Sequence, residues 1–415
     1  MTKIGYAFNT ITPDEPVLLA GYNCERWSKN VHDDLMCHLI VLEYHDKKIC
    51  FVQFDLLGID DVFIEMLKQK SKLYGIDELI AGAIHTHAGP KGTCVVQGIE
   101  GIFGEYDEKY VSKCVTVFEE CLKTALTDLE EFDVKISTQT IENICSERHS
   151  PDRPFDNVLW KIEFSLYNNK KILIYNYSCH PTILHDDNQS ISADLIGQVR
   201  QDLSQIYDMV MFYNGSAGDV STRFTRQGSN FQEVERLGHL LSDQIQHNKE
   251  YVIYEGKLDI IQIYHEQIAL KTWQTNHIEN YKNRVDQLAR EISLGDSSQE
   301  MKYNEMKSYY DFLKNNKYPQ NHDQITIPFD IIKFNQCFII TIPSEITSSL
   351  TLSLTQKYQC MIFSYTGGYH LYIPSVNAFD HRDYEAAMSI LERGQGEKLI
   401  EYIEECLQKL NIKEK

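Results

Sequence analysis

Two histidines, His85 and His87, follow an apolar segment at residues 79–84 and precede Gly89-Pro90. The segment has the composition of a β-strand, and residues i and i+2 of an extended chain point to the same side. The two imidazoles are therefore expected to converge on one centre, where such side chains bind a metal ion or transfer protons. The spacing alone also fits two ordinary polar histidines at the end of a strand.

A third histidine has a similar position. Residues 172–179 form another apolar segment, and His180 follows it directly. Carboxylates come soon afterwards in Asp186, Asp187 and Asp194, and a carboxylate often orients a ligating imidazole through its second ring nitrogen. Asp194 fits a second role equally well, as the N-cap of a helix that begins near residue 194.

Three further segments carry groups that could act beside such a centre. Residues 212–221 lead from an apolar strand into a loop with two glycines, which presents Ser221 or its backbone N–H groups. This loop lacks the GxSxG elbow of α/β-hydrolases and the lysine of a P-loop, and it also fits a plain turn. Glu345 follows an apolar strand and Tyr372 follows a glycine pair. Taken singly, Glu345 fits the start of a helix and Tyr372 a packed aromatic side chain.

The composition limits the class of protein. The 415 residues are 42% apolar and 24% charged, which is typical of a globular chain, and no apolar run approaches the roughly 18 residues of a membrane span. A formal charge of -20 repels phosphate backbones and excludes nucleic acid as an expected partner. The chain starts without an apolar signal segment, and its 11 cysteines form no CxxC pair. We therefore expect a cytoplasmic protein.

The elements that must position these residues alternate along the chain. Apolar strands at 37–42 and 49–54 flank a turn and predict a β-hairpin, and the segments at 159–166 and 171–177 predict a second one. Helical periodicity is found at 111–129, at 194–203 and near the C-terminus, and a helical hairpin is expected as an insertion at about 277–316. Because hairpins require antiparallel pairing, the predicted fold class is α/β (mixed α+β), with a large mixed β-sheet layered with helices in one domain over residues 1–415.

Taken together, the segments resemble the catalytic domain of the neutral/alkaline (non-lysosomal) ceramidases and their bacterial relatives. The resemblance rests on HTHAGP at 85–90, NYSCHPT at 176–182, NGSAGDVS at 214–221, IPSE at 342–345, and Tyr372 with Tyr384-Glu385. These segments are similar to the family's HTHSGP motif, second histidine strand, GDVSP loop, P-x-E segment and Y-[IV]-x-T…YE spacing, with Ser375 in place of the threonine. Their common order along nearly the whole chain makes the resemblance specific.

The resemblance implies a zinc ion held by His85, His180, Glu345 and Tyr372. It implies that His87 lies beside the metal and donates to the reacting carbonyl or the leaving amine. Ser221 matches the family's catalytic serine, which either attacks the carbonyl or orients the substrate while zinc activates water. We favour activated water, because zinc lowers the pKa of its water toward about 7 and no dedicated base lies near Ser221 in the sequence.

The same resemblance implies that Tyr384 and an arginine contact the substrate. The family's arginine motif reads Asn-Arg-Ser-Pro, whereas this chain has Glu147-Arg148-His149-Ser150-Pro151. Arg148 is our assignment for the arginine, with His149 as the alternative.

Two departures from the family separate this chain from true ceramidases. Ser221 is followed by Thr222-Arg223-Phe224 instead of Pro-Asn, and no immunoglobulin-like C-terminal domain is expected. We interpret the protein as a zinc-dependent amidohydrolase of an N-acyl amide or lipid-like substrate, which need not be ceramide. The alternatives are a zinc esterase or phosphoesterase, and a catalytically silent ligand-binding module on the same fold.

Overall fold

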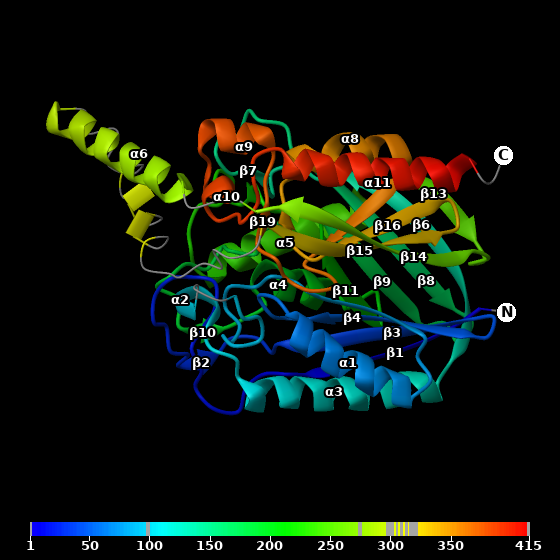
Figure 1. Ribbon diagram of the computed structural model, residues 1–415. Coiled ribbons are helices and arrows are strands. Elements are labelled where there is room, and N and C mark those ends of the chain that lie inside the picture. Colours follow the sequence, from blue (N-terminus) through cyan, green and yellow to red (C-terminus); the bar gives the residue numbers. More distant parts are fainter. Residues whose placement is uncertain are drawn as a thin grey trace.

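A computed structural model gives the structure of residues 2–96, 100–272, 276–295 and 323–412, and of a few single residues between 303 and 314. The elements stack in four layers: helices, a large sheet, a smaller sheet and a second set of helices (Figure 1). Alternating apolar side chains explain the layers, because the buried strands have two faces to cover.

The large sheet is mixed, and in the described part of the chain its nine strands follow the order β11-β9-β8-β6-β1-β3-β4-β5, with β13 paired to β6. The strands are β1 (Lys3–Thr10), β3 (Met36–Tyr44), β4 (Lys47–Phe54), β5 (Glu78–Ala83), β6 (Glu130–Thr140), β8 (Val158–Leu166), β9 (Lys171–Tyr177), β11 (Met209–Asn214) and β13 (Tyr251–Gly256). Only the pairs β4–β5 and β9–β11 are parallel among these strands. The two predicted hairpins are confirmed as β3–β4 and β8–β9, both antiparallel.

One face of the large sheet packs against four helices. These are α1 (Asp61–Leu73), α3 (Glu108–Thr127), α4 (Asp194–Leu203) and α5 (Phe231–His247). Leu39 and Val41 of β3 lie on this face, whereas Ile40 between them lies on the other. The starts of α1 and α3 are capped by Asp60 and Asp107, whose carboxylates accept the N–H three residues further on.

The other face of the large sheet packs on a four-stranded sheet. Its strands are β14 (Ile261–Lys271), β15 (Gln324–Phe334), β16 (Cys337–Ile342) and β18 (Cys360–Ser364). Ile332 and Ile339 face the large sheet, while Ile331 and Ile340 face α8 (Ser348–Tyr358) and α11 (Gln395–Ile412). The predicted fold class, a mixed sheet core layered with helices, is confirmed. That the strands divide into two sheets did not follow from the pattern.

Short elements gather at one end of the layers, on the left of Figure 1. They are β2 (Asn30–Val31), β7 (Ser146–Glu147), β10 (Ser190–Ile191), β12 (Val220–Ser221), β17 (Glu345–Ile346), β19 (Tyr372–Ile373), α2 (Glu100–Phe103), α9 (Val376–His381) and α10 (Tyr384–Ala387). The first arm of the expected helical hairpin is α6 (Asn276–Ser293). Most of the expected second arm lies outside the described residues.

All 11 cysteines are free, and all but Cys24 are buried, so most of them act as small core residues. Among the described helices, none has a stretch long and apolar enough to cross a lipid bilayer.

Candidate metal centre

The two histidine segments leave strands at opposite ends of the large sheet, yet they meet. The sheet curves until its ends approach: Tyr213 Oη of β11 donates to the carbonyls of Val52 at 3.4 Å and Ile80 at 3.3 Å, in β4 and β5. Asn214 then joins the two segments, because its Nδ2 donates to the carbonyls of Ile84 at 3.3 Å and Cys179 at 2.8 Å. These carbonyls directly precede His85 and His180.

His85 and His180 face each other through their Nε2 atoms. His85 Nδ1 lies 2.8 Å from the Leu57 carbonyl and His180 Nδ1 lies 2.7 Å from the Ala217 carbonyl, so each Nδ1 donates its proton. The two Nε2 atoms are 3.2 Å apart. Burial lowers the pKa of His180, which favours the neutral ring. Neutral rings of this tautomer direct two lone pairs at one point.

The imidazoles converge for a different reason from the one the sequence suggested. Strand β5 ends at Ala83, and His85 has φ +72°, a left-handed conformation that is unusual for a residue with a Cβ atom. The prediction of extended backbone is therefore wrong, and a turn brings the rings together. The Tyr365 ring stacks on His85 with ring centroids 4.2 Å apart and holds it in place.

Glu345 supplies an anionic oxygen to the same point. Its Oε2 lies 3.4 Å from His85 Nε2 and 3.3 Å from His180 Nε2, and the side chain is buried. Oε1 accepts a hydrogen bond from Tyr369 Oη, whereas Oε2 has no hydrogen-bond partner among the described residues. Two imidazole nitrogens and a carboxylate oxygen that converge in a buried site fit a cation, and this donor set is typical of zinc.

Tyr372 lies beside Glu345 because the two short strands that carry them are paired. The short strands β17 and β19 are parallel, and Glu345 is the register partner of Tyr372. The predicted ligand set His85, His180, Glu345 and Tyr372 is thus drawn from strand ends that adjoin one another. Its role as a ligand set stays a prediction.

His87 belongs to the same cluster but differs in its hydrogen bonds. Its Nε2 lies 3.2 Å from His85 Nε2, and it forms with His85 and His180 a group of possible metal ligands. Its Nδ1 is buried and has no partner among the described residues. Burial, followed by the neighbouring histidines, holds the pKa of His87 well below its usual value. Gly21, at φ +91°, lies so close that a Cβ there would be 2.2 Å from His87 Nδ1, so no larger residue fits.

The loop at residues 214–221, here called the serine loop, is hydrogen-bonded to the segments that carry His180 and Glu345. The His180 N–H donates to the Val220 carbonyl at 3.2 Å, beside Ser221. The Gly218 N–H donates to the Ile346 carbonyl at 2.9 Å, and a Cβ at Gly218 would be 2.8 Å from the Glu345 carbonyl. The loop is therefore more than a plain turn, because it fixes two of the strand ends that carry the centre.

Two buried aspartates fasten the surrounding segments. Asp219 Oδ1 accepts from the Ser348 N–H at 2.6 Å at the start of α8, and burial raises the pKa of Asp219 to about 7. Asp194 accepts from the N–H groups of Ile183 and Leu184 and so anchors the chain after His180. In the described hydrogen bonds, Asp194 does not contact an imidazole. The N-cap of α4 is Ala193, so Asp194 does not cap the helix either, and both expected roles of Asp194 are wrong.

Arg148 and His149 share one carboxylate. Arg148 Nε lies 2.5 Å from Glu385 Oε1, and His149 Nε2 lies 2.8 Å from Glu385 Oε2. Burial raises the pKa of Glu385, but the charge of Arg148 and the hydrogen bond from His149 outweigh it and lower the pKa to about 2. The Arg148 guanidinium lies 4.6 Å from the Tyr384 ring centroid and 5.7 Å from that of Tyr372. Both candidates for the arginine-motif role therefore lie together.

A cavity of about 180 Å³ opens onto the centre. Of the predicted site residues, it is lined by His87, Arg148, His180, Ser221, Tyr372 and Tyr384. His85 and Glu345 are not in its lining and are both buried. Sequence reasoning did not assign a role to Tyr22, His185, Arg223 or Arg226, which also line it. Of these four residues, only Arg223 stood out in the sequence, because it is part of the departure from the family pattern after Ser221.

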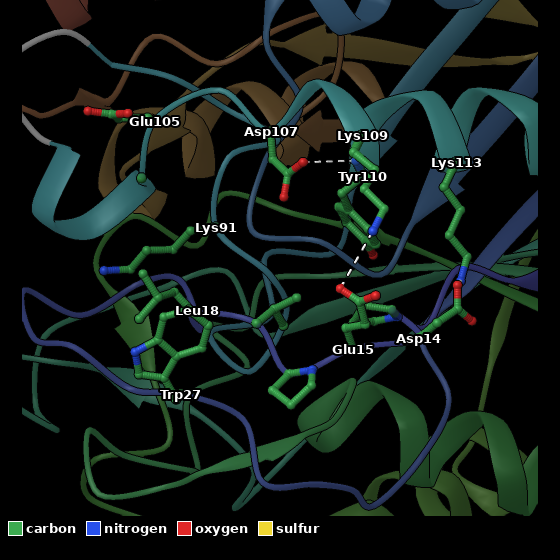
Figure 2. A pocket seen from close by; sticks show the side chains of 14 residues that line it. Asp14, Glu15, Leu18, Trp27, Lys91, Glu105, Asp107, Lys109, Tyr110 and Lys113 are labelled. Atoms are coloured by element: carbon green, nitrogen blue, oxygen red, sulfur yellow. Dashed lines mark hydrogen bonds and ion pairs between the residues drawn. The ribbon is translucent and has the colours of Figure 1, made fainter.

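A larger hollow of about 740 Å³ is built differently (Figure 2). It is bordered by Leu18 and Trp27, and four of its charged groups form two ion pairs: Lys113 Nζ lies 2.8 Å from Asp14 and Lys109 Nζ lies 3.5 Å from Glu15. None of the predicted site residues lines it.

Two solved structures are similar to this chain. One, a ceramidase complexed with C2, has a TM-score of 0.74 and 15% identity over 96% of this chain and 74% of its own. The other, neutral ceramidase from Pseudomonas aeruginosa, has a TM-score of 0.75 and 16% identity over 97% of this chain and 73% of its own. The resemblance inferred from the segments is thus confirmed for the fold. No family model and no curated protein matches the sequence.

Proposed function

We propose that the protein is a zinc-dependent amidohydrolase that cleaves an N-acyl amide to a carboxylate and an amine. One observation carries the proposal: two imidazole Nε2 atoms and Glu345 Oε2 converge in a buried site, while the Nδ1 atom of each ring faces a backbone carbonyl. The shared fold with two ceramidases supports the reaction class. The 11 free cysteines support a cytoplasmic location.

His85, His180 and Glu345, with Tyr372 beside them, would hold the metal. When bound, zinc polarises a carbonyl and acidifies water. The carbonyls of Leu57 and Ala217 keep His85 and His180 in the ligating tautomer, as outer hydrogen bonds commonly do for metal-bound histidines. His87 Nδ1 has no such carbonyl partner in the parts of the chain that the structure describes, which supports a role other than ligand.

His87, Arg148 and Tyr384 would act on the substrate. A neutral His87 ring has one N–H and one lone pair. The N–H can donate to the carbonyl oxygen, and the lone pair can take a proton from the attacking water, which the resulting imidazolium then delivers to the departing nitrogen. Glu385 keeps Arg148 charged and fixed, and Arg148 in turn lies over Tyr384. Fixed donors stabilise a developing oxyanion because they need no reorganisation during the reaction.

Ser221 is proposed to orient the substrate. Its Oγ accepts from the Arg223 N–H at 3.3 Å. Among the described residues, no basic side chain is within hydrogen-bond distance of Ser221 Oγ to remove its proton, and an unactivated serine is a weak nucleophile.

The test is hydrolysis by the zinc-loaded protein of a panel of N-acyl amides of increasing chain length, with ceramide included. Matched p-nitrophenyl esters and phosphates and a Glu345→Gln variant complete the design. Amide cleavage that Glu345→Gln abolishes is the expected result. Faster cleavage of esters or phosphates would favour the esterase, and bound zinc without turnover would favour the ligand-binding module.

A further inference from the structure

The cavity over the centre has a charge opposite to that of the chain. Among the described residues, its lining includes three arginines, Arg148, Arg223 and Arg226, and four histidines, but no aspartate or glutamate. The whole chain, in contrast, has a formal charge of -20. Cationic side chains are therefore concentrated where a substrate would bind.

Two of the three arginines are not neutralised by a carboxylate. Arg148 pairs with Glu385, but no described carboxylate lies within ion-pair distance of Arg223 or Arg226. Arg226 Nη1 donates to the Thr182 carbonyl at 2.8 Å, and Arg223 Nη1 donates to the Arg148 carbonyl at 3.3 Å. Carbonyl contacts position these guanidinium groups and leave other N–H donors for a ligand.

No acidic residue around Arg226 forms an ion pair with it in the described part of the chain. Asp194 is buried and accepts three backbone N–H groups, from Ile183, Leu184 and Leu195. Glu233 forms an ion pair with Arg236 at 2.6 Å, and Asp186 is exposed to solvent. Burial lowers the pKa of Arg226, so its charge is costly in the absence of an anion.

We propose that Arg223 and Arg226 bind an anionic group of the substrate, and that the substrate is a compact acyl amide with a carboxylate or a phosphate. This inference rests on the proposed amidase function. Planar guanidinium groups bind both anions through paired N–H donors. The cavity of about 180 Å³ is smaller than the roughly 300–1,000 Å³ typical of small-molecule sites, which favours a small substrate over a lipid with two long chains.

The experiment compares three matched substrates: N-butanoylglycine, N-butanoylethanolamine and the phosphate monoester of the latter. We expect kcat/KM for one of the anionic amides to exceed that of the neutral amide by about tenfold or more. The better anionic amide identifies the group. In Arg226→Gln the ratio of anionic to neutral kcat/KM falls toward one, mainly through KM. Arg223→Gln has a smaller effect, because Arg223 is exposed.

Arg393→Gln is the control, because it removes the same charge from an exposed arginine that pairs with Asp380 outside the cavity. It keeps the wild-type ratio, and circular dichroism checks that every variant is folded. Equal kcat/KM for all three substrates in the wild type would overturn the anion site and leave the amidase intact.

If the protein cleaves none of the three substrates, calorimetry with N-butanoylglycine and N-butanoylethanolamine phosphate measures whether the anionic amides bind. Binding that is lost in Arg226→Gln would keep the anion site, and the panel of longer N-acyl amides would then decide the amidase. Absence of binding would reject the anion site and leave the amidase to that panel.

Discussion

Hydrogen bonds of the ring nitrogens separate the three histidines of the centre into two kinds. His85 and His180 each donate from Nδ1 to a backbone carbonyl, which leaves Nε2 free to bind a metal. His87 Nδ1 has no such partner in the described part of the chain. This difference supports the proposed ligand role of the first two and the proposed proton-donor role of His87.

The His87→Ala variant tests that assignment. We expect turnover to fall by about a hundredfold or more, the usual effect of removing a donor to a developing oxyanion, while zinc stays bound. Steady-state kinetics and metal analysis of the same preparation measure both quantities. Loss of zinc in this variant would make His87 a ligand and contradict the division of roles.

The residue types of the centre could be predicted, but their surroundings could not. His85, His180, Glu345 and Tyr372 stood out because each follows an apolar strand or a glycine pair. Asn214 did not, since an asparagine beside a glycine usually indicates a turn. Its contacts with Ile84 and Cys179 join segments that are far apart in sequence.

At the scale of elements, Asn214 joins the ends of β5 and β9. Replacing it with alanine leaves the N–H of Cys179 and the carbonyls of Ile84 and Cys179 without their side-chain partner. We expect Asn214→Ala to lower the free energy of unfolding by about 1–3 kcal/mol and to weaken zinc binding. Chemical denaturation and a zinc-chelator competition measure the two effects. Unchanged zinc affinity would show that the linkage does not position the centre.

Asp219 connects the serine loop to α8 and gives stability a pH dependence. The carboxyl keeps its proton up to about pH 7 in the folded state because it is buried, whereas the unfolded chain releases it above about pH 4. The unfolded state therefore binds fewer protons in this window, and the contribution of Asp219 to stability falls as pH rises from about 4 to about 7.

Asp219→Asn should reduce this loss, since the amide oxygen can still accept from the Ser348 N–H but does not ionise. Thermal unfolding of both proteins at pH 5 and pH 7.5 makes the comparison. If Tm changes between pH 5 and pH 7.5 by the same amount in the wild type and in Asp219→Asn, the role of Asp219 is refuted.

The hairpins and helices could be predicted because they depend on local patterns. Alternating apolar residues identified β3, β4, β8 and β9, and helical spacing identified α3 and α4. The curvature that brings Tyr213 against Val52 and Ile80 depends on contacts between the two ends of a sheet. No window of sequence contains such contacts.

At the scale of the whole molecule, an acidic chain surrounds a cationic cavity. The formal charge is -20, yet the cavity lining, as far as the structure describes the chain, includes three arginines and no carboxylate. Such a contrast draws anions toward the cavity and keeps the remaining surface apart from anionic lipid and nucleic acid. The four layers provide a rigid support, because both sheets are covered on the faces that the site does not use.

The most direct test of the account is the zinc content of the purified chain, measured by plasma mass spectrometry. Wild type, His180→Ala and Glu345→Ala are compared with His239→Ala, which removes an exposed histidine that pairs with Asp202. We predict close to one zinc per chain in the wild type and in His239→Ala, and loss of zinc from the other two variants while they remain folded. Wild-type protein that takes up no zinc on reconstitution, or ligand variants that keep it, would contradict the account.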